Sequence, residues 1–102
     1  MIKSYKDLIV WQKGMDLAVN VYQLSDCFPH HELYSLTNQI RRAAVSVPSN
    51  IAEGKGRNSK SEYLHFLSIA KGSLLELETQ LILSNHLGYA ENKEFKGNFR
   101  AD

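Results

Sequence analysis

Arginine, serine, asparagine and glutamate side chains recur at three- and four-residue intervals in the middle of this 102-residue chain. On a helix this spacing places them along one face. A purely solvated face would carry an interchangeable mixture of lysine and glutamate, whereas this face is built from arginines and short hydrogen-bonding groups, which suits a specific contact. Its members, here called the polar stripe, are Arg42, Ser46, Asn50, Glu53 and Arg57.

Two interpretations of the polar stripe stay open. In the structural one, Ser46 and Asn50 hydrogen-bond to backbone carbonyls that a nearby proline leaves free. Glu53 then pairs with Arg42 or Arg57. A buried network of this kind can fix the register between helices or between subunits. In the functional interpretation the stripe contacts a ligand or nucleic acid. The structural or subunit-interface interpretation is favoured, because native polar networks more often hold a fold than bind a partner.

Positive charge is concentrated in the same region, although the chain's net charge is only +1. Residues 41–60 carry five bases against one acid, whereas the segments before and after are slightly acidic. The five bases, here called the predicted basic set, are Arg41, Arg42, Lys55, Arg57 and Lys60.

The predicted basic set is a candidate nucleic-acid contact, because arginine beside a glycine-containing turn suits phosphate binding. The alternative is a solvated helix end, where the helix dipole favours cations. On one subunit the patch is weak, but copies repeated around an oligomer would form a strongly positive zone. This stretch lacks the aromatic residues on which single-strand binders stack bases.

Catalytic and metal-binding patterns are missing from the sequence. It contains no phosphate-cradling glycine loop, nucleophile elbow or zinc-protease motif. Four histidines are present, and two of them form the pattern Cys27-x-x-His30-His31, but this pattern lacks a second matched pair of zinc ligands. We therefore expect a non-enzymatic protein with no catalytic residues, no metal and no cofactor.

Length and composition predict a single domain over residues 1–102 with a modest core. No uncharged apolar run is long enough to predict a transmembrane helix, so no membrane partner is expected. The N-terminal residues lack an apolar signal segment, and the single cysteine fits a reducing compartment. These observations predict a cytoplasmic protein.

Apolar residues at helical spacing predict three long helices, at about residues 7–25, 31–53 and 60–87. A short fourth helix is predicted around residues 91–96, where a following glycine opposes extension. The connections are short, so neighbouring helices should run antiparallel, up and down. The third helix is apolar on more than one side and needs several partners. The predicted fold class is all-α, an antiparallel up-and-down four-helix bundle with a short or truncated fourth helix.

Glycine and proline give further expectations within the first two helices. Gly14 inside the first helix predicts the close approach of a neighbouring helix, because glycine otherwise costs a helix about 1 kcal/mol. Pro48 removes a backbone hydrogen bond, but the apolar register continues past it, which predicts a kinked, continuous second helix. Gly54 and Gly56 are expected to end that helix.

Two short motifs mark the ends of the third helix. Ser59 and Glu62 have the spacing of a capping box at its start. Gly88 is suited to the position after its last turn, with Tyr89 as a hydrophobic contact beyond it.

The sequence resembles the family of bacterial four-helix-bundle proteins encoded in intervening sequences of 23S ribosomal RNA genes. The resemblance covers roughly residues 5–90. The matching pieces are Asp7-Leu8, Val10-Trp11-Gln12-Lys13, Phe28-Pro29, Leu36-Thr37, Gln39-Ile40-Arg41-Arg42-Ala43, Ser46-Val47-Pro48, Asn50-Ile51-Ala52-Glu53-Gly54, Gly56-Arg57, Glu62-Tyr63, Phe66-Leu67, Ala70-Lys71-Gly72-Ser73 and Glu76-Leu77-Glu78.

This resemblance implies an antiparallel four-helix bundle that assembles into a homopentamer. The chain is also similar to the accessory subunit of diversity-generating retroelements, a pentameric barrel that binds nucleic acid and a reverse transcriptase. By analogy, RNA or DNA and a protein such as a reverse transcriptase are candidate partners. Family members generally continue past residue 89 into a full fourth helix, whereas thirteen residues remain here.

The functional expectation is a non-enzymatic, oligomeric helical bundle that binds structured RNA or other nucleic acid through the predicted basic set. The alternative is a protein-interaction module or assembly scaffold with no nucleic-acid role. That module would hold a partner helix in the apolar groove beside the short fourth helix.

Overall fold

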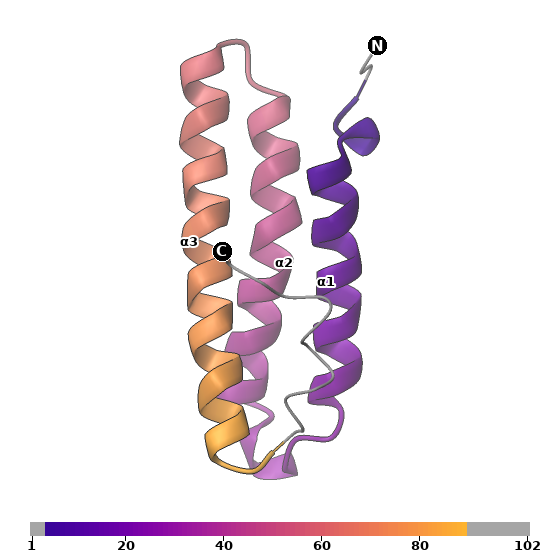
Figure 1. Ribbon diagram of the computed structural model, residues 1–102, viewed down its shortest axis with the longest axis vertical. Helices are drawn as coiled ribbons and strands as arrows, with labels where there is room; N and C mark the ends of the chain where they lie inside the picture. Colours follow the sequence, from indigo (N-terminus) through magenta and orange to yellow (C-terminus); the bar gives the residue numbers. More distant parts are fainter. Residues whose placement is uncertain (1–3, 90–102) are drawn as a thin grey trace.

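The computed structural model describes residues 4–89 (Figure 1). Three long helices make up most of this part of the chain: α1 spans Ile9–Ser25, α2 spans Leu36–Lys55 and α3 spans Lys60–His86. Residues 4–89 contain no strand, which confirms the predicted all-α class. The fourth helix expected at residues 91–96 lies outside the described residues.

Helix α2 lies between the other two helices (Figure 1) and packs against both of them. Direct contacts between α1 and α3 are few. The core is centred on Val21 of α1, Ile40 of α2 and Leu77 of α3, each with no exposed surface. The apolar stripe expected along the second helix is therefore the buried face of α2, on which Leu36, Ile40, Ala44, Val47 and Ile51 all lie.

Gly14 of α1 lies directly against Pro48 of α2. The glycine is buried, and a Cβ atom added there would stand 3.4 Å from the Cβ of Pro48. This contact confirms the close helix approach expected at Gly14. Helix α2 continues through Pro48, as predicted, and the kink at this proline stays a prediction.

The start of the chain forms a 3₁₀ turn, Tyr5–Asp7, before α1 begins at Ile9 rather than at residue 7. The amide of Lys6 donates to the Ser4 hydroxyl over 3.0 Å, and the Ser4 amide donates to the Asp7 carboxylate over 3.3 Å. Leu8 then takes an extended conformation, with ψ of 125°, which separates the turn from the helix.

The predicted start of the second helix near residue 31 was wrong, because His30–Glu32 forms a separate 3₁₀ turn and α2 begins at Leu36. Of the two glycines expected to end α2, Gly56 is its C-terminal cap, as predicted, whereas Gly54 lies inside the helix, which runs on to Lys55. A Cβ atom at Gly54 would lie 2.7 Å from the Cβ of Phe66, so this glycine serves the close packing of α3.

Helix α3 begins as expected at the Ser59 cap, whose hydroxyl oxygen accepts the Glu62 amide over 3.2 Å. The Glu62 carboxylate accepts from the Ser59 hydroxyl rather than from its amide, so the capping box is only half formed. At the far end, Gly88 has φ of +78° and its amide donates to Asn85. The Tyr89 amide donates to the Ser84 carbonyl, which completes a Schellman turn.

Candidate nucleic-acid interface

The fold separates the predicted basic set into two groups. Arg42 and Lys55 lie thirteen residues apart on α2, a distance of about 20 Å along the helix axis. Arg41 and Arg42 therefore belong to the N-terminal half of α2, whereas Lys55, Arg57 and Lys60 surround the turn between α2 and α3. The five bases do not form one patch on a single subunit.

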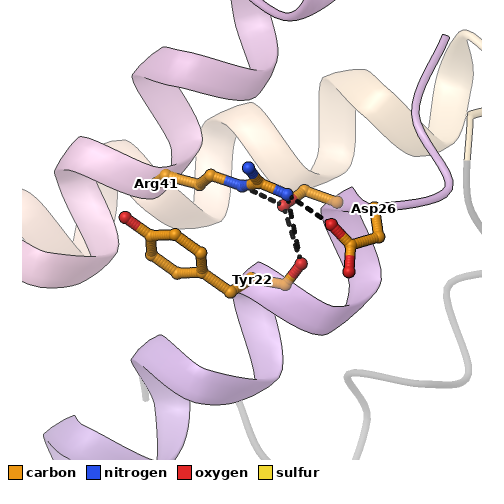
Figure 2. A network of polar contacts seen from close by, with 4 residues as sticks. Tyr22, Asp26 and Arg41 are labelled. Atoms are coloured by element: carbon orange, nitrogen blue, oxygen red, sulfur yellow. Dashed lines mark hydrogen bonds and ion pairs between the residues drawn. The ribbon is translucent and has the colours of Figure 1, made fainter. Parts of the chain in front are cut away.

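Arg41 is engaged at the C-terminal end of α1 (Figure 2). Its Nε donates to the Ser25 hydroxyl over 2.7 Å, and its Nη2 donates to the Tyr22 carbonyl over 3.3 Å and to Asp26 over 2.9 Å. The guanidinium carbon also lies 4.8 Å from the centroid of the Tyr22 ring. Arg41 thus ties α2 to the last turn of α1, and its side chain is only 21% exposed.

Two bases of the second group, Lys55 and Arg57, lie over aromatic rings of α3. The Lys55 ammonium lies 5.7 Å from the centroid of the Tyr63 ring, and the Arg57 guanidinium lies 4.7 Å from that of Phe66. Both arrangements are cation–π contacts. We call these two bases, Lys60 and the two rings the basic turn.

Sequence analysis missed the aromatic part of the basic turn, because Tyr63 and Phe66 lie outside the 41–60 segment. Both rings are half-buried. The available signal was their spacing, which places them one and two turns after the Ser59 cap and hence beside the end of α2.

An ion pair with Glu53 further orients Arg57, at a distance of 2.8 Å between Nη2 and Oε2. Both side chains are substantially exposed, so this pair contributes little to stability. Lys55 and Lys60 form no ion pair with any other residue between 4 and 89. The basic turn therefore offers two cations outside any such ion pair and one arginine that its neighbours hold in place.

The polar stripe forms part of the seam between α2 and α3. The hydroxyls of Ser46 and Ser73 are 2.8 Å apart. The Asn50 amide donates to the Ser46 carbonyl over 2.8 Å and to its hydroxyl over 2.9 Å. The Asn50 side chain therefore reaches the Ser46 carbonyl and not the Ala44 carbonyl. The Ala44 carbonyl is the one that lacks its helical donor, because proline at position 48 has no N–H group. The Ser46–Ser73 contact joins two helices, and Asn50 bonds to Ser46 within α2, which favours the structural interpretation of Ser46 and Asn50.

The seam continues toward the other end of the molecule through Gln80, which is only 8% exposed. Its Nε2 lies 3.4 Å from Gln39 Oε1 and 3.4 Å from a Glu76 carboxylate oxygen. Arg42 is exposed on the same stripe and makes no ion pair within the described part of the chain. The polar stripe thus combines the part-buried Ser46 and Asn50 with three exposed residues, Arg42, Glu53 and Arg57.

An apolar groove of about 350 Å³ lies between α1 and α2. Met15 on one wall and Val45 on the other are each 41% exposed. The lining residues are Tyr5, Trp11, Met15, Ala18, Val45, Pro48, Ser49 and Ala52. The groove gives the molecule an apolar surface that sequence analysis did not place between these two helices.

A second apolar surface lies on α3, where Leu64, Leu75 and Ile82 are each about half exposed. The three residues are eleven and seven apart, so they share one face of the helix. We call this surface the outer stripe of α3. The third helix was expected to be apolar on more than one side. The outer stripe of α3 is one such side, and none of the described residues covers it.

Within residues 4–89, no three potential metal-ligating side chains of histidine, cysteine, aspartate or glutamate gather at one place. Among the same residues, no helix is both long enough and apolar enough to cross a membrane.

Comparison with known families matches residues 6–100 to the family described as 23S rRNA-intervening sequence protein. The match spans all three helices and nearly the whole chain. A comparison with curated proteins found no match.

Proposed function

This chain belongs to the 23S rRNA-intervening sequence protein family, and on that premise we propose that it is a non-enzymatic, oligomeric bundle protein that binds structured RNA. Other nucleic acid of similar backbone charge would bind through the same surface. The basic turn carries the proposal. Its cations lie at one end of the helix pair, and all three are exposed among the described residues, so a phosphate backbone could reach them.

The contacts of the basic turn favour backbone recognition over base recognition. Tyr63 and Phe66 are half-buried, and Lys55 and Arg57 lie over their rings. The rings therefore orient the cations and are not free platforms for bases. Affinity carried by phosphate contacts falls steeply with salt and depends little on nucleotide sequence.

The test is the affinity of the whole chain for a fluorescently labelled, structured ribosomal RNA fragment, measured by anisotropy at several salt concentrations. Replacing Lys55, Arg57 and Lys60 together with alanine should weaken binding at low salt by tenfold or more. The slope of log affinity against log salt should also fall by about one for each phosphate that the variant no longer neutralises.

The matched control replaces Lys6, Lys13 and Lys71 with alanine. It removes the same formal charge from exposed positions outside the basic turn. Unchanged tight binding by the basic-turn variant, or an equal loss in both variants, would contradict the assignment of the interface.

Two apolar surfaces support the proposal that the protein assembles into an oligomer. The groove between α1 and α2 and the outer stripe of α3 are different surfaces of one chain. A contact between the groove of one copy and the outer stripe of the next is heterologous, and repeated heterologous contacts close into rings when the rotation allows. The family resemblance implies a ring of five, which would repeat the basic turn five times.

The antiparallel arrangement of the bundle belongs to the same proposal. It is supported by the seam, where Gln39 faces Gln80 and Ser46 faces Ser73. The residue number rises along α2 while the number of its partner falls along α3. An antiparallel pair of helices produces this relation.

A second candidate function is a protein-interaction module or assembly scaffold without a nucleic-acid role. The apolar groove between α1 and α2 is the observation that favours it. In this case the oligomer would form through the same two apolar surfaces. RNA would change neither the mass of the oligomer nor the dependence of that mass on salt. A protein partner such as a reverse transcriptase would be captured equally well by the basic-turn variant.

A further inference from the structure

A polar contact joins the end of α3 to the 3₁₀ turn that precedes α2. The hydroxyl of Tyr89 donates to a carboxylate oxygen of Glu32 over 2.6 Å. The Glu32 side chain is only 16% exposed, and Tyr89 is half-buried. This contact lies at the end of α3 away from the basic turn and plays no part in the proposed RNA interface.

Glu32 makes a second contact that ties the same carboxylate to α2. Its Oε1 lies 3.4 Å from the amide nitrogen of Leu36, the first residue of that helix. Ser35 occupies the capping position, but its side chain makes no capping hydrogen bond. Glu32 therefore takes over part of the cap of α2 while it accepts the Tyr89 hydroxyl.

Packing of the tyrosine ring holds its hydroxyl in position. The Tyr89 ring centroid lies 5.6 Å from that of Phe28 and 6.5 Å from that of His31. Phe28 is buried in the core cluster, and Tyr89 packs against the same cluster. The Tyr89–Glu32 contact thus closes one end of the core.

We propose that Glu32 and Tyr89 form an acid-sensitive latch, which fastens the end of α3 to the start of α2 while Glu32 is ionised and opens when Glu32 takes up a proton. A carboxylate accepts hydrogen bonds from a phenol and an amide more strongly than a neutral carboxylic acid does. Protonation weakens both contacts at once, so the end of α3 and the cap of α2 loosen together.

The environment of Glu32 agrees with this direction. The hydrogen bond from Tyr89 lowers the pKa of Glu32 below its usual 4.5, burial opposes that shift, and the Leu36 amide and the nearby His31 lower the pKa further. The same hydrogen bond raises the pKa of Tyr89 above 10. His31 and Tyr89 are the titratable groups that face Glu32 among residues 4–89.

The sign of the pH dependence follows from the lowered pKa. The unfolded chain protonates Glu32 near pH 4.5, whereas the folded chain does so at a lower pH. The latch therefore contributes its full stability above that value and loses it as the pH falls through the folded-state pKa.

The test is amide hydrogen exchange, measured residue by residue from pH 6 to pH 3 on the whole chain and expressed as protection factors. In the natural sequence, protection at Leu36 and Tyr89 should fall by about fivefold or more as Glu32 protonates. Protection at the fully buried Leu77 should stay constant. A parallel loss at Leu77 would mean global unfolding and would contradict a local latch.

Two variants make the test specific. Tyr89→Phe keeps the packed ring and removes only the hydroxyl, so protection at position 89 should be low already at pH 6, and the pKa of Glu32 should return toward 4.5. Glu32→Gln should give low protection that is independent of pH. The control is Tyr34→Phe, at a tyrosine that is 90% exposed.

The proposal is overturned if Tyr89→Phe keeps the protection and the pH profile of the natural sequence. It is also overturned if carbon NMR shows that the Glu32 carboxyl titrates identically in the Tyr89→Phe variant and in the natural sequence. Because phenylalanine preserves the ring contacts, this variant gives an answer even if Glu32→Gln does not fold.

Discussion

Two glycines set how closely the helices approach one another. Gly14 lets α1 rest on Pro48, and Gly54 lets α3 rest on the last turn of α2. The sequence indicated the first role, because a glycine within an otherwise apolar helix needs compensation. It misassigned the second, because Gly54 stands near the helix end, where glycine more often serves as a terminator.

Gly54→Ala should lower the free energy of unfolding by about 1–3 kcal/mol, although alanine is the better helix former. The new Cβ would lie 2.7 Å from the Cβ of Phe66 and 3.3 Å from the Tyr63 carbonyl, and neither atom is the end of a flexible side chain. Urea denaturation followed by circular dichroism measures the change.

Gly72→Ala is the matched control. Among residues 4–89, no side chain and no backbone atom of another segment lies within 4 Å of a Cβ added at this position in α3, beyond its chain neighbours. The substitution should stabilise the protein by up to about 1 kcal/mol through helix propensity alone. A loss of stability at Gly72 similar to that at Gly54 would contradict the packing argument.

Arg41 illustrates what residue type alone does not reveal. Sequence analysis grouped it with the other bases, but its partners at Ser25 and Asp26 lie fifteen or more residues away in the chain. Arg41→Ala should lower the free energy of unfolding by about 1–2 kcal/mol, because the buried Ser25 hydroxyl loses a charged donor. RNA affinity, measured at a temperature where the variant is folded, should fall less than in the basic-turn variant. A larger fall would restore Arg41 to the interface.

At the scale of the helices, periodicity placed all three correctly, because an apolar stripe is a property of the local sequence. The boundaries of α2 were less predictable. Its start depends on Glu32, whose partner Tyr89 is 57 residues away in the chain. Near its end, Gly54 packs closely against Phe66 of the next helix. Tertiary contacts of this kind, which no window of neighbouring residues contains, accompany both boundaries.

Pro48→Ala should stabilise α2, because it restores a backbone donor for the Ala44 carbonyl. The gain should be smaller than the roughly 3 kcal/mol that proline costs a helix interior, since the proline ring no longer packs on Gly14. The substitution also alters the wall of the groove between α1 and α2, so assembly should weaken. Thermal unfolding and solution mass measure the two effects, and unchanged mass and helicity would show that the proline has neither role.

At the scale of the whole molecule, the proposed RNA interface could be predicted only in part. The segment of excess positive charge includes the three bases of the basic turn, but sequence analysis could not show which bases already have partners within the fold. It also could not bring Tyr63 and Phe66 under the cations, because that requires the turn from α2 into α3. The groove between α1 and α2 was unpredictable for the same reason, since its two walls come from different helices.

Solution mass from light scattering, at low and high salt and with and without the ribosomal RNA fragment, tests the assembly. The expected mass is near five chains for the natural sequence. Leu75→Glu should reduce it, because a charge is placed in the outer stripe of α3. Gln23→Glu adds the same charge at an exposed position of α1 and should leave the mass unchanged. A monomer in the natural sequence would contradict the ring.

The position of α2 between its neighbours has a consequence for the order in which the chain folds. Helices α2 and α3 are joined by a turn of only four residues and pack against each other along their length, so their pairing closes a small loop at low entropic cost. Helix α1 rests mainly on α2 and can add to a hairpin that already exists. The ribosome synthesises α1 first, but α1 would dock last, after α2 and α3 have emerged and paired.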